Sequence, residues 1–195
     1  SHQVSFNMIA AMTALYGVGQ IAGPLIAGAL YQIAASFNPA LYAAALALLI
    51  AAADQLTKLL VVQHIPLHTT LPLLPGVVSL TYVQNDGAAF SSFRGMQWMF
   101  LLIFLIFTAS IFYEYFKKPM PFSKWERVLI AAVYGGGLGN LIDRVRLGYV
   151  VDMIQTEFMN FPVFNVADCF ISCGCILLML HLILCNKQIW KEDKK

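Results

Sequence analysis

Long stretches without any charged side chain dominate this sequence and limit what it can fold into. The first 53 of its 195 residues contain no Asp, Glu, Lys or Arg. Three shorter charge-free stretches follow, at residues 95–113, 128–142 and 169–186. A helix needs roughly 20 mostly apolar residues to cross the hydrocarbon core of a bilayer. The chain is therefore predicted to be a polytopic membrane protein, surrounded largely by lipid.

The overall composition supports this prediction and excludes other classes of protein. Charged side chains make up 11% of the residues, whereas soluble domains average about 25%. The mean hydropathy is +0.72, which excludes a disordered chain, because disorder requires low hydrophobicity and high net charge. The net charge of +2 is too small for a protein that binds nucleic acid by neutralising phosphates, so no nucleic-acid partner is expected.

The charge-free stretches, together with the prolines and glycines that break them, predict a mainly α protein with five membrane helices. The expected helices cover about residues 8–35, 40–63, 96–116, 124–145 and 165–186. The segment between the second and third helices contains three prolines, followed by β-branched residues around Val77 and Val78 that favour strands. Backbone that is neither helix nor closed barrel cannot face lipid, so residues 64–93 are expected to form a small β-module outside the bilayer.

The distribution of Lys and Arg predicts the orientation of the chain in the membrane. Eight of the twelve basic residues lie in the segments 117–127 and 187–195. Loops rich in Lys and Arg stay on the cytoplasmic side. The β-module at 64–93 and the loop expected at 146–163 are then extracytoplasmic, and Glu126 is expected to be solvated or near the lipid headgroups.

Ionisable side chains inside predicted spans are functional hypotheses by default, because each costs a few kcal/mol to insert. Asp54 and Lys58 lie four residues apart on one helix, within reach of an ion pair. Two interpretations stay open for them: a mutual pair that only helps insertion, or groups that orient a nearby site.

A second polar cluster follows a glycine-rich stretch. Gly135 and Gly139 have the spacing that lets membrane helices approach closely. Asn140, Asp143 and Arg144 then share one helix face, where Asp143 and Arg144 can neutralise each other locally. A purely structural cluster and a functional one are both consistent with this pattern.

Two further acids, Asp152 and Asp168, are expected beside apolar residues at the outer membrane edge. Separately, Asp152 could be a loop acid and Asp168 a helix N-cap. If they share one site, the two carboxyl groups cannot both ionise easily, and one keeps a proton. One can then activate a water while the other donates a proton, as in aspartic proteases. The sequence spacing alone does not show that they meet.

Five motifs in this order make residues from about 41 to 190 resemble lipoprotein signal peptidase, the membrane aspartic endopeptidase family of bacteria also called signal peptidase II. The motifs lie at residues 54–58, 85–90, 139–144, 150–152 and 164–168. By this resemblance Asp152 and Asp168 are the catalytic pair, without a metal or cofactor. The residues that it implies for substrate binding or support are Asp54, Lys58, Asn85, Gly87, Asn140, Asp143, Arg144 and Asn165.

The resemblance also implies a fold, a substrate and a location. It implies a core of four transmembrane helices with a small extracytoplasmic β-module, to which this chain adds one N-terminal helix. The implied substrate is a prolipoprotein that carries diacylglycerol on a cysteine and is cut just before that cysteine. The implied location is the bacterial cytoplasmic membrane, with the active site on the outer side, membrane lipid as a partner and a monomeric enzyme.

The front of the chain departs from this family. Residues 1 to about 50 resemble the last helices of a major-facilitator transporter, through the motifs at 17–24 and 36–42. A gene fusion or an engineered chimera would explain this, with a seam between Ala43 and Ala53. The predicted division is a transporter-like extension at 1–39, a peptidase-like domain at 40–190 and a basic cytoplasmic tail at 191–195.

Other features predict no additional site. Pro66 lies between His64 and His68 and argues against a helical metal pair, and no third ligand is near. The four cysteines have no partner cluster that would suggest a disulfide framework. The alternative function is a transporter-derived membrane module without peptidase activity. The transporter-like part argues against it, because its roughly two helices carry no Asp, Glu, Lys or Arg.

Overall fold

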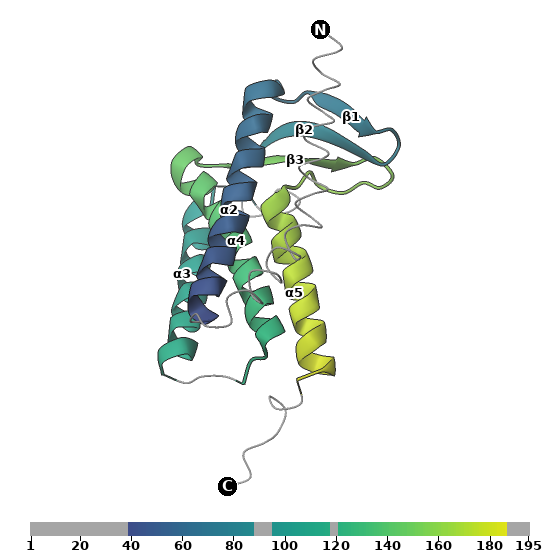
Figure 1. Cartoon of the computed structure of the whole chain (residues 1–195). Coiled ribbons are helices and arrows are strands. Elements are labelled where there is room, and N and C mark those ends of the chain that lie inside the picture. Colours follow the sequence, from purple (N-terminus) through teal and green to yellow (C-terminus); the bar gives the residue numbers. More distant parts are fainter. Residues whose placement is uncertain (1–38, 88–94, 118–120, 187–195) are drawn as a thin grey trace.

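The computed structural model describes residues 39–87, 95–117 and 121–186, which form four helices and a three-stranded sheet (Figure 1). The helices are α2 (Pro39–His64), α3 (Gln97–Phe116), α4 (Lys124–Leu147) and α5 (Val166–Leu184). The strands are β1 (Thr70–Leu74), β2 (Val78–Asn85) and β3 (Val150–Thr156). The helix expected at residues 8–35 lies outside the described residues.

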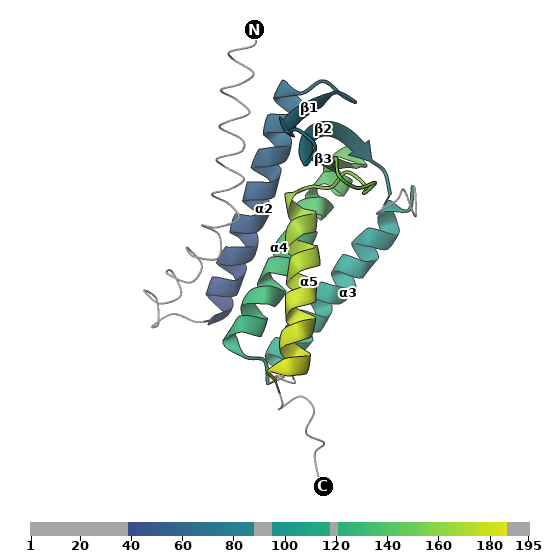
Figure 2. The ribbon, with the colours of Figure 1, turned by 90° about the vertical axis from the view of Figure 1, so that its right-hand side faces the viewer.

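The four described helices are each long and apolar enough to cross a membrane, which confirms the predicted four-helix core. In the view of Figure 2, α4 and α5 lie between α2 and α3, and the sheet covers one end of the bundle. Helix α4 packs against both α2 and α5, whereas α3 packs mainly on α4. Helix α3 ends and α4 begins at the end of the bundle opposite the sheet (Figure 1), so the basic residues Lys117, Lys124 and Arg127 belong to that end.

The glycines of α4 allow this close packing. A Cβ atom added to Gly135 would lie 2.6 Å from the backbone oxygen of Ala47 on α2. One added to Gly136 would lie 2.6 Å from the backbone oxygen of Ala167 on α5. The absence of side chains therefore brings both neighbouring backbones against α4, as expected for small residues in membrane helix interfaces.

The sheet contains a strand that was expected to be a loop. The prediction of a loop over 146–163 was wrong for Val150–Thr156, which forms β3 and pairs antiparallel with β2. The strand order is β1-β2-β3, so β2 is central and pairs with a neighbour on both edges. Addition of β3 satisfies backbone groups that a two-stranded hairpin would leave unpaired. It also brings Asp152 from a distant part of the sequence to the sheet.

The hydrophobic core lies where the sheet meets the end of α2. Its buried members are Val61, Ile65, Leu80, Tyr82, Val151, Met153 and Ile154. Removal of their apolar surface from water holds the sheet on the helix end, at about 25 cal/mol for each Å² buried. The residues that flank Asp152 in the sequence, Val151 and Met153, are both in this core. Their packing fixes β3 on both sides of Asp152.

At the opposite end of the bundle the structure corrects one expectation. Glu126 is fully buried rather than solvated. It forms a capping box with Ser123, and its carboxylate also accepts from Asn186 Nδ2 at 2.7 Å and lies 2.8 Å from His181 Nδ1. These contacts from the end of α5 satisfy the acid and tie the start of α4 to the end of α5.

The proposed orientation can be tested with single cysteines. With the four native cysteines replaced by alanine, Val77→Cys in the β1–β2 turn should react with a membrane-impermeant maleimide on intact spheroplasts. Pro121→Cys, in the segment before α4, should react only after permeabilisation, because the basic segments retain that end in the cytoplasm. Both positions are exposed in the structure. The reverse labelling pattern would place the sheet in the cytoplasm.

Candidate active site

Asp152 and Asp168 both contact Asn165, at the sheet end of the bundle. The Asn165 side chain donates from Nδ2 to Asp152 Oδ1 at 2.7 Å. Its backbone N–H donates to Asp168 Oδ2 at 3.2 Å. Asp152 lies on β3, Asp168 lies in the first turn of α5, and Asn165 is the N-cap of that helix. The fold therefore brings the two acids into contact with one residue.

The start of α5 holds Asp168 in place. Asn165 Oδ1 accepts a hydrogen bond from the backbone N–H of Asp168 at 2.9 Å, which completes a capping box. Asp168 is thus the third helical residue rather than the N-cap, which was one interpretation of the sequence. The partial positive charge of a helix N-terminus favours a carboxylate at this position.

Asp152 is buried, and its carboxyl group accepts from two asparagines. Asn85 Nδ2 donates to Oδ2 at 2.9 Å, and Asn165 donates to Oδ1. The pKa of Asp152 is raised to about 7, first by burial and then by the negative charge of Asp168, against the lowering effect of these two hydrogen bonds. A carboxyl group with this pKa still carries a proton on a substantial fraction of molecules at neutral pH.

Asn140 connects Asp168 to the interior of the bundle. Its Nδ2 donates to Asp168 Oδ1 at 2.8 Å. Its Oδ1 accepts from Lys58 Nζ at 2.9 Å and from Asn165 Nδ2 at 3.0 Å. An ammonium group can only donate, so Lys58 requires the amide oxygen of Asn140 to face it. The amide nitrogen is thereby directed at Asp168.

Lys58 is the centre of a buried ion cluster. Its Nζ lies 2.8 Å from Asp54 Oδ2, which confirms the predicted pair, and 3.0 Å from Asp143 Oδ2 on α4. All three side chains are almost completely buried. The sequence allowed local neutralisation of Asp143 by Arg144, but in the structure the Lys58 ammonium of α2 contacts Asp143.

The two acids of this cluster each hold the backbone next to a candidate catalytic residue. Asp54 Oδ1 accepts from the backbone N–H of Ala167 at 2.9 Å, one residue before Asp168. Asp143 Oδ2 accepts from the backbone N–H of Val151 at 3.1 Å, one residue before Asp152. The cluster therefore positions α5 and β3 and is more than a pair that helps insertion.

Gln55 lies inside the first motif but was not among the residues expected at the site. Its Nε2 donates to Asp143 Oδ1 at 2.8 Å and to the backbone oxygen of Gly139 at 3.1 Å. A Cβ atom added to Gly139 would lie 2.5 Å from Asp54 Oδ2, so this glycine lets α2 and α4 meet here. Because the Gln55 side chain is uncharged, its presence in a predicted span does not suggest a function. Only its position between Asp54 and Lys58 could have indicated a role.

Arg144, also on α4, lies beside the turn that follows β2. It donates from one guanidinium nitrogen to Asn140 O at 3.3 Å and from another to Gly87 O at 3.1 Å. Gly87 N–H in turn donates to Asn85 Oδ1 at 3.0 Å, which orients the amide that contacts Asp152. Residues 88–90 of this motif lie outside the described residues. Every supporting residue predicted from the sequence is thus part of one connected network.

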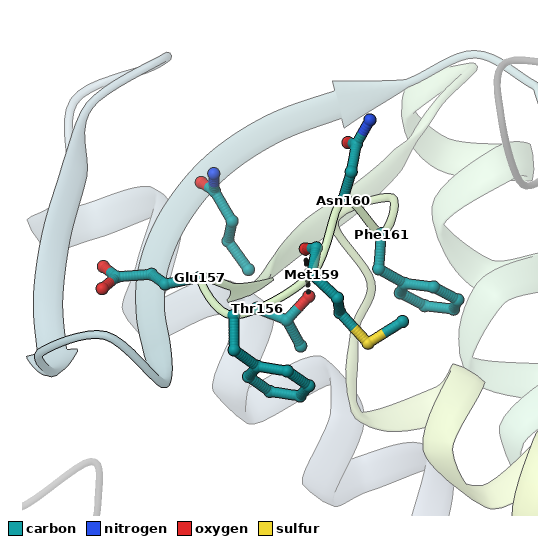
Figure 3. A pocket seen from close by; sticks show the side chains of 7 residues that line it. Thr156, Glu157, Met159, Asn160 and Phe161 are labelled. Atoms are coloured by element: carbon teal, nitrogen blue, oxygen red, sulfur yellow. Dashed lines mark hydrogen bonds between the residues drawn. The ribbon is translucent and has the colours of Figure 1, made fainter.

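A separate hollow of about 480 Å³ lies beside the segment that follows β3 (Figure 3). Its lining includes Thr156, Met159 and Phe161, and Thr156 Oγ1 donates to the backbone oxygen of Met159 at 3.3 Å. Glu157 extends toward the β1–β2 hairpin, where its carboxylate accepts from Gly76 N–H at 2.6 Å. None of the residues that line this hollow belongs to the network around Asp152 and Asp168.

Comparison with known proteins identifies the class of this fold and network. Residues 46–184, more than half of the chain, match the family model described as signal peptidase (SPase) II, so the protein is a membrane peptidase. The chain belongs to the signal peptidase II family. Residues 1–56 match a second model, described as an uncharacterised MFS-type transporter, YbfB. The two matches overlap at residues 46–56, within α2.

Individual relatives agree with this assignment. Lipoprotein signal peptidase of Streptococcus agalactiae serotype V is 45% identical over 146 residues, which cover 75% of this chain and 90% of that protein. The enzyme of Streptococcus pyogenes serotype M2 is 42% identical over 146 residues, which cover 75% and 91%. A bacterial membrane enzyme solved at 2.3 Å by the in meso method matches with a TM-score of 0.65 and 29% identity, covering 76% of this chain and 90% of that one.

The ion cluster predicts a non-additive response to mutation. Lys58→Met leaves two buried carboxylates without their cation and should destabilise the protein by about 3–5 kcal/mol. Adding Asp143→Asn to this variant should recover part of the loss, because the second change removes one of the uncompensated charges. Thermal unfolding in detergent micelles measures the stability of Lys58→Met, Asp143→Asn and the double variant. If the stability losses of the two single variants add up to the loss of the double variant, Lys58 and Asp143 are not coupled.

Proposed function

We propose that this protein is an aspartic endopeptidase that removes the signal peptides of prolipoproteins carrying diacylglycerol on a cysteine, cutting just before that cysteine. Membership of the signal peptidase II family supports the substrate class. The observation that supports the mechanism is that Asp152 and Asp168 both accept hydrogen bonds from Asn165. Two carboxyl groups so arranged can divide the roles of acid and base between them.

The surroundings of each acid favour one assignment of roles. Asp152 has a pKa raised to about 7 and is suited to carry the shared proton. Asp168 lies at a helix N-terminus, a position that attracts negative charge, and it accepts from Asn140 and from the backbone of Asn165. Asp152 is then the general acid, and Asp168 is the general base that activates a water.

The proton transfers balance in this assignment. Asp168 takes a proton from the attacking water as the oxygen bonds to the scissile carbonyl carbon, and Asp152 donates its proton to the carbonyl oxygen. When the C–N bond breaks, Asp168 passes its proton to the leaving amine of the lipidated cysteine. Asp152 recovers its proton from the hydroxyl of the intermediate as the carboxyl product forms. Both acids return to their starting states.

The position of the pair in the bundle fits a substrate anchored by lipid. Asp168 opens α5 at the end of the bundle that the sheet covers, so the site lies near the end of the membrane spans (Figure 1). A diacylglycerol group held in the bilayer would set the depth of the adjacent peptide bond. Orientation of the scissile bond by binding energy then contributes directly to the rate. The basic residues Lys117, Lys124 and Arg127 of the opposite segment support a site on the outer face of the cytoplasmic membrane. One chain supplies both acids, which supports a monomeric enzyme.

Loss of either acid should abolish most of the turnover. Asp152→Asn and Asp168→Asn each keep shape and polarity but remove a proton-transfer group, and each should lower kcat by about 10²–10⁴-fold. The double variant should be no slower than the worse single variant, because both acids act as one unit. The measurement is the mass of products formed from a diacylated prolipoprotein. Full cleavage by either single variant would disprove the aspartic mechanism.

The rate should also depend on pH in a predictable direction. In the free enzyme the general acid Asp152 loses its proton as the pH rises through about 7. The value of kcat/KM should therefore fall above that pH, approaching a tenfold loss for each further unit. Steady-state rates over a pH series in detergent micelles give this profile. A rate that rises steadily from pH 6 to 9 would contradict Asp152 as the acid.

A further inference from the structure

Arg144 is half-buried, and its contacts differ from those of the buried cation Lys58. Its hydrogen-bond partners are the backbone oxygens of Asn140 and Gly87, which are neutral. None of the ion pairs among the described residues includes Arg144, and its Nε has no hydrogen-bond partner among them. In contrast to Lys58, its charge is not neutralised by direct contact with a carboxylate.

The contacts of Arg144 nevertheless connect it to the two candidate catalytic acids. Asn140, whose backbone oxygen accepts from Arg144, donates from its side chain to Asp168. Gly87, whose backbone oxygen also accepts from Arg144, donates to Asn85, which contacts Asp152. A cation near an acid favours its ionised form even without a direct contact to its oxygens. This leaves the carboxyl oxygens available for a water and for the scissile carbonyl group.

The ring of Phe100 stabilises the guanidinium charge of Arg144, a role that a carboxylate often has in other sites. The guanidinium carbon of Arg144 lies 4.2 Å from the centroid of this ring. An aromatic face attracts a cation through its quadrupole but carries no net charge, and this attraction strengthens where water is excluded. Phe100 therefore holds Arg144 at a defined position and leaves its full charge in place.

The start of α3 is tied to the same turn that contacts Arg144. Gln97 Nε2 donates to the backbone oxygen of Asp86 at 2.8 Å, and Gly95 N–H donates to the same oxygen at 3.2 Å. Asp86 precedes Gly87, whose backbone oxygen accepts from Arg144. Phe100 follows Gln97 by one helical turn. Helix α3 has no buried residue of its own, so the contact with Arg144 connects an otherwise peripheral helix to the site.

We propose that Phe100 is a positioning residue for the peptidase reaction, whose ring keeps the unneutralised guanidinium of Arg144 directed at Asp168 and Asp152. This rests on the proposed function, because it assigns Phe100 a role only through the two acids. It gives α3 a part in catalysis that neither its sequence nor its burial indicates.

The proposal predicts a change in the pH profile, so the charges around the pair must be considered. They are Asp152 on β3, Asp168 on α5, Asp143 and Arg144 on α4, Asp54 and Lys58 on α2, and Asp86 in the turn before α3. Between Gln97 and Tyr113, α3 carries no Asp, Glu, Lys or Arg. If the ring is lost, Arg144 can move away, and Asp152 then binds its proton more tightly. The limb of the rate profile that reports Asp152 should shift to higher pH.

The test compares substitutions of Phe100 with a matched substitution on the same helix. Phe100→Leu removes the aromatic face and should lower kcat by about tenfold near pH 7, with the profile shifted to higher pH. Phe100→Tyr keeps the face and should retain the profile of the unmodified protein. Phe104→Leu is the control, since Phe104 packs on Tyr134 at 4.9 Å between ring centroids, one turn away. It should lower thermal stability without shifting the profile.

The outcomes separate this proposal from the proposed function. A profile that does not shift in Phe100→Leu, or that shifts equally in Phe104→Leu, would overturn the role of Phe100. If Phe100→Leu does not fold, Phe100→Met, which keeps a long apolar side chain, makes the same test. Asp152→Asn measured in parallel tests the mechanism itself. An inactive Asp152→Asn beside an unshifted Phe100→Leu would overturn only the role of Phe100.

Discussion

The site depends on one buried cation. Lys58 contacts Asp54, Asp143 and Asn140, and through them it determines where α2, α4, α5 and β3 meet. An isolated charge inside a membrane span costs several kcal/mol, and that cost is offset only if every partner is in place. The cluster is therefore specific as well as stabilising: a different packing of the helices would leave at least one of these groups buried without a partner.

The close approach of the helices makes this cluster possible. Lys58 on α2 contacts Asp143 and Asn140 where α2 and α4 lie close together, and Gly135 and Gly139 of α4 permit this approach. A Cβ atom at either glycine would lie less than 3 Å from an oxygen of α2, so a side chain there would force the helices apart. In lipid there is no hydrophobic drive between helices, so small residues and polar contacts have to act together. The glycines allow α2 and α4 to approach, and the ion cluster then holds the two helices together.

Around this centre the charges have two different uses. The carboxylates of Asp54 and Asp143 are paired with Lys58 and hold the backbone of Ala167 and Val151. Asp152 and Asp168 instead receive hydrogen bonds mainly from asparagines, which orient them and leave the pair able to exchange protons. Neutral amides are suited to this because they bind a carboxyl group without fixing its charge. Arg144 is likewise held by neutral groups, two backbone oxygens and an aromatic ring, so that its positive charge is retained.

The sequence by itself determined which segments cross the membrane and which polar residues are out of place there, because charge-free length and helical spacing are local properties. The pair of Asp54 and Lys58, four residues apart on one helix, was predictable for this reason. The sequence motifs also identified the family. Only the tertiary structure decided that Val150–Thr156 joins the sheet, that Lys58 rather than Arg144 neutralises Asp143, and that Glu126 is buried. The same holds for the contact between Phe100 and Arg144. Each of these depends on how closely separate elements approach, and neither spacing nor composition along the chain reports that distance.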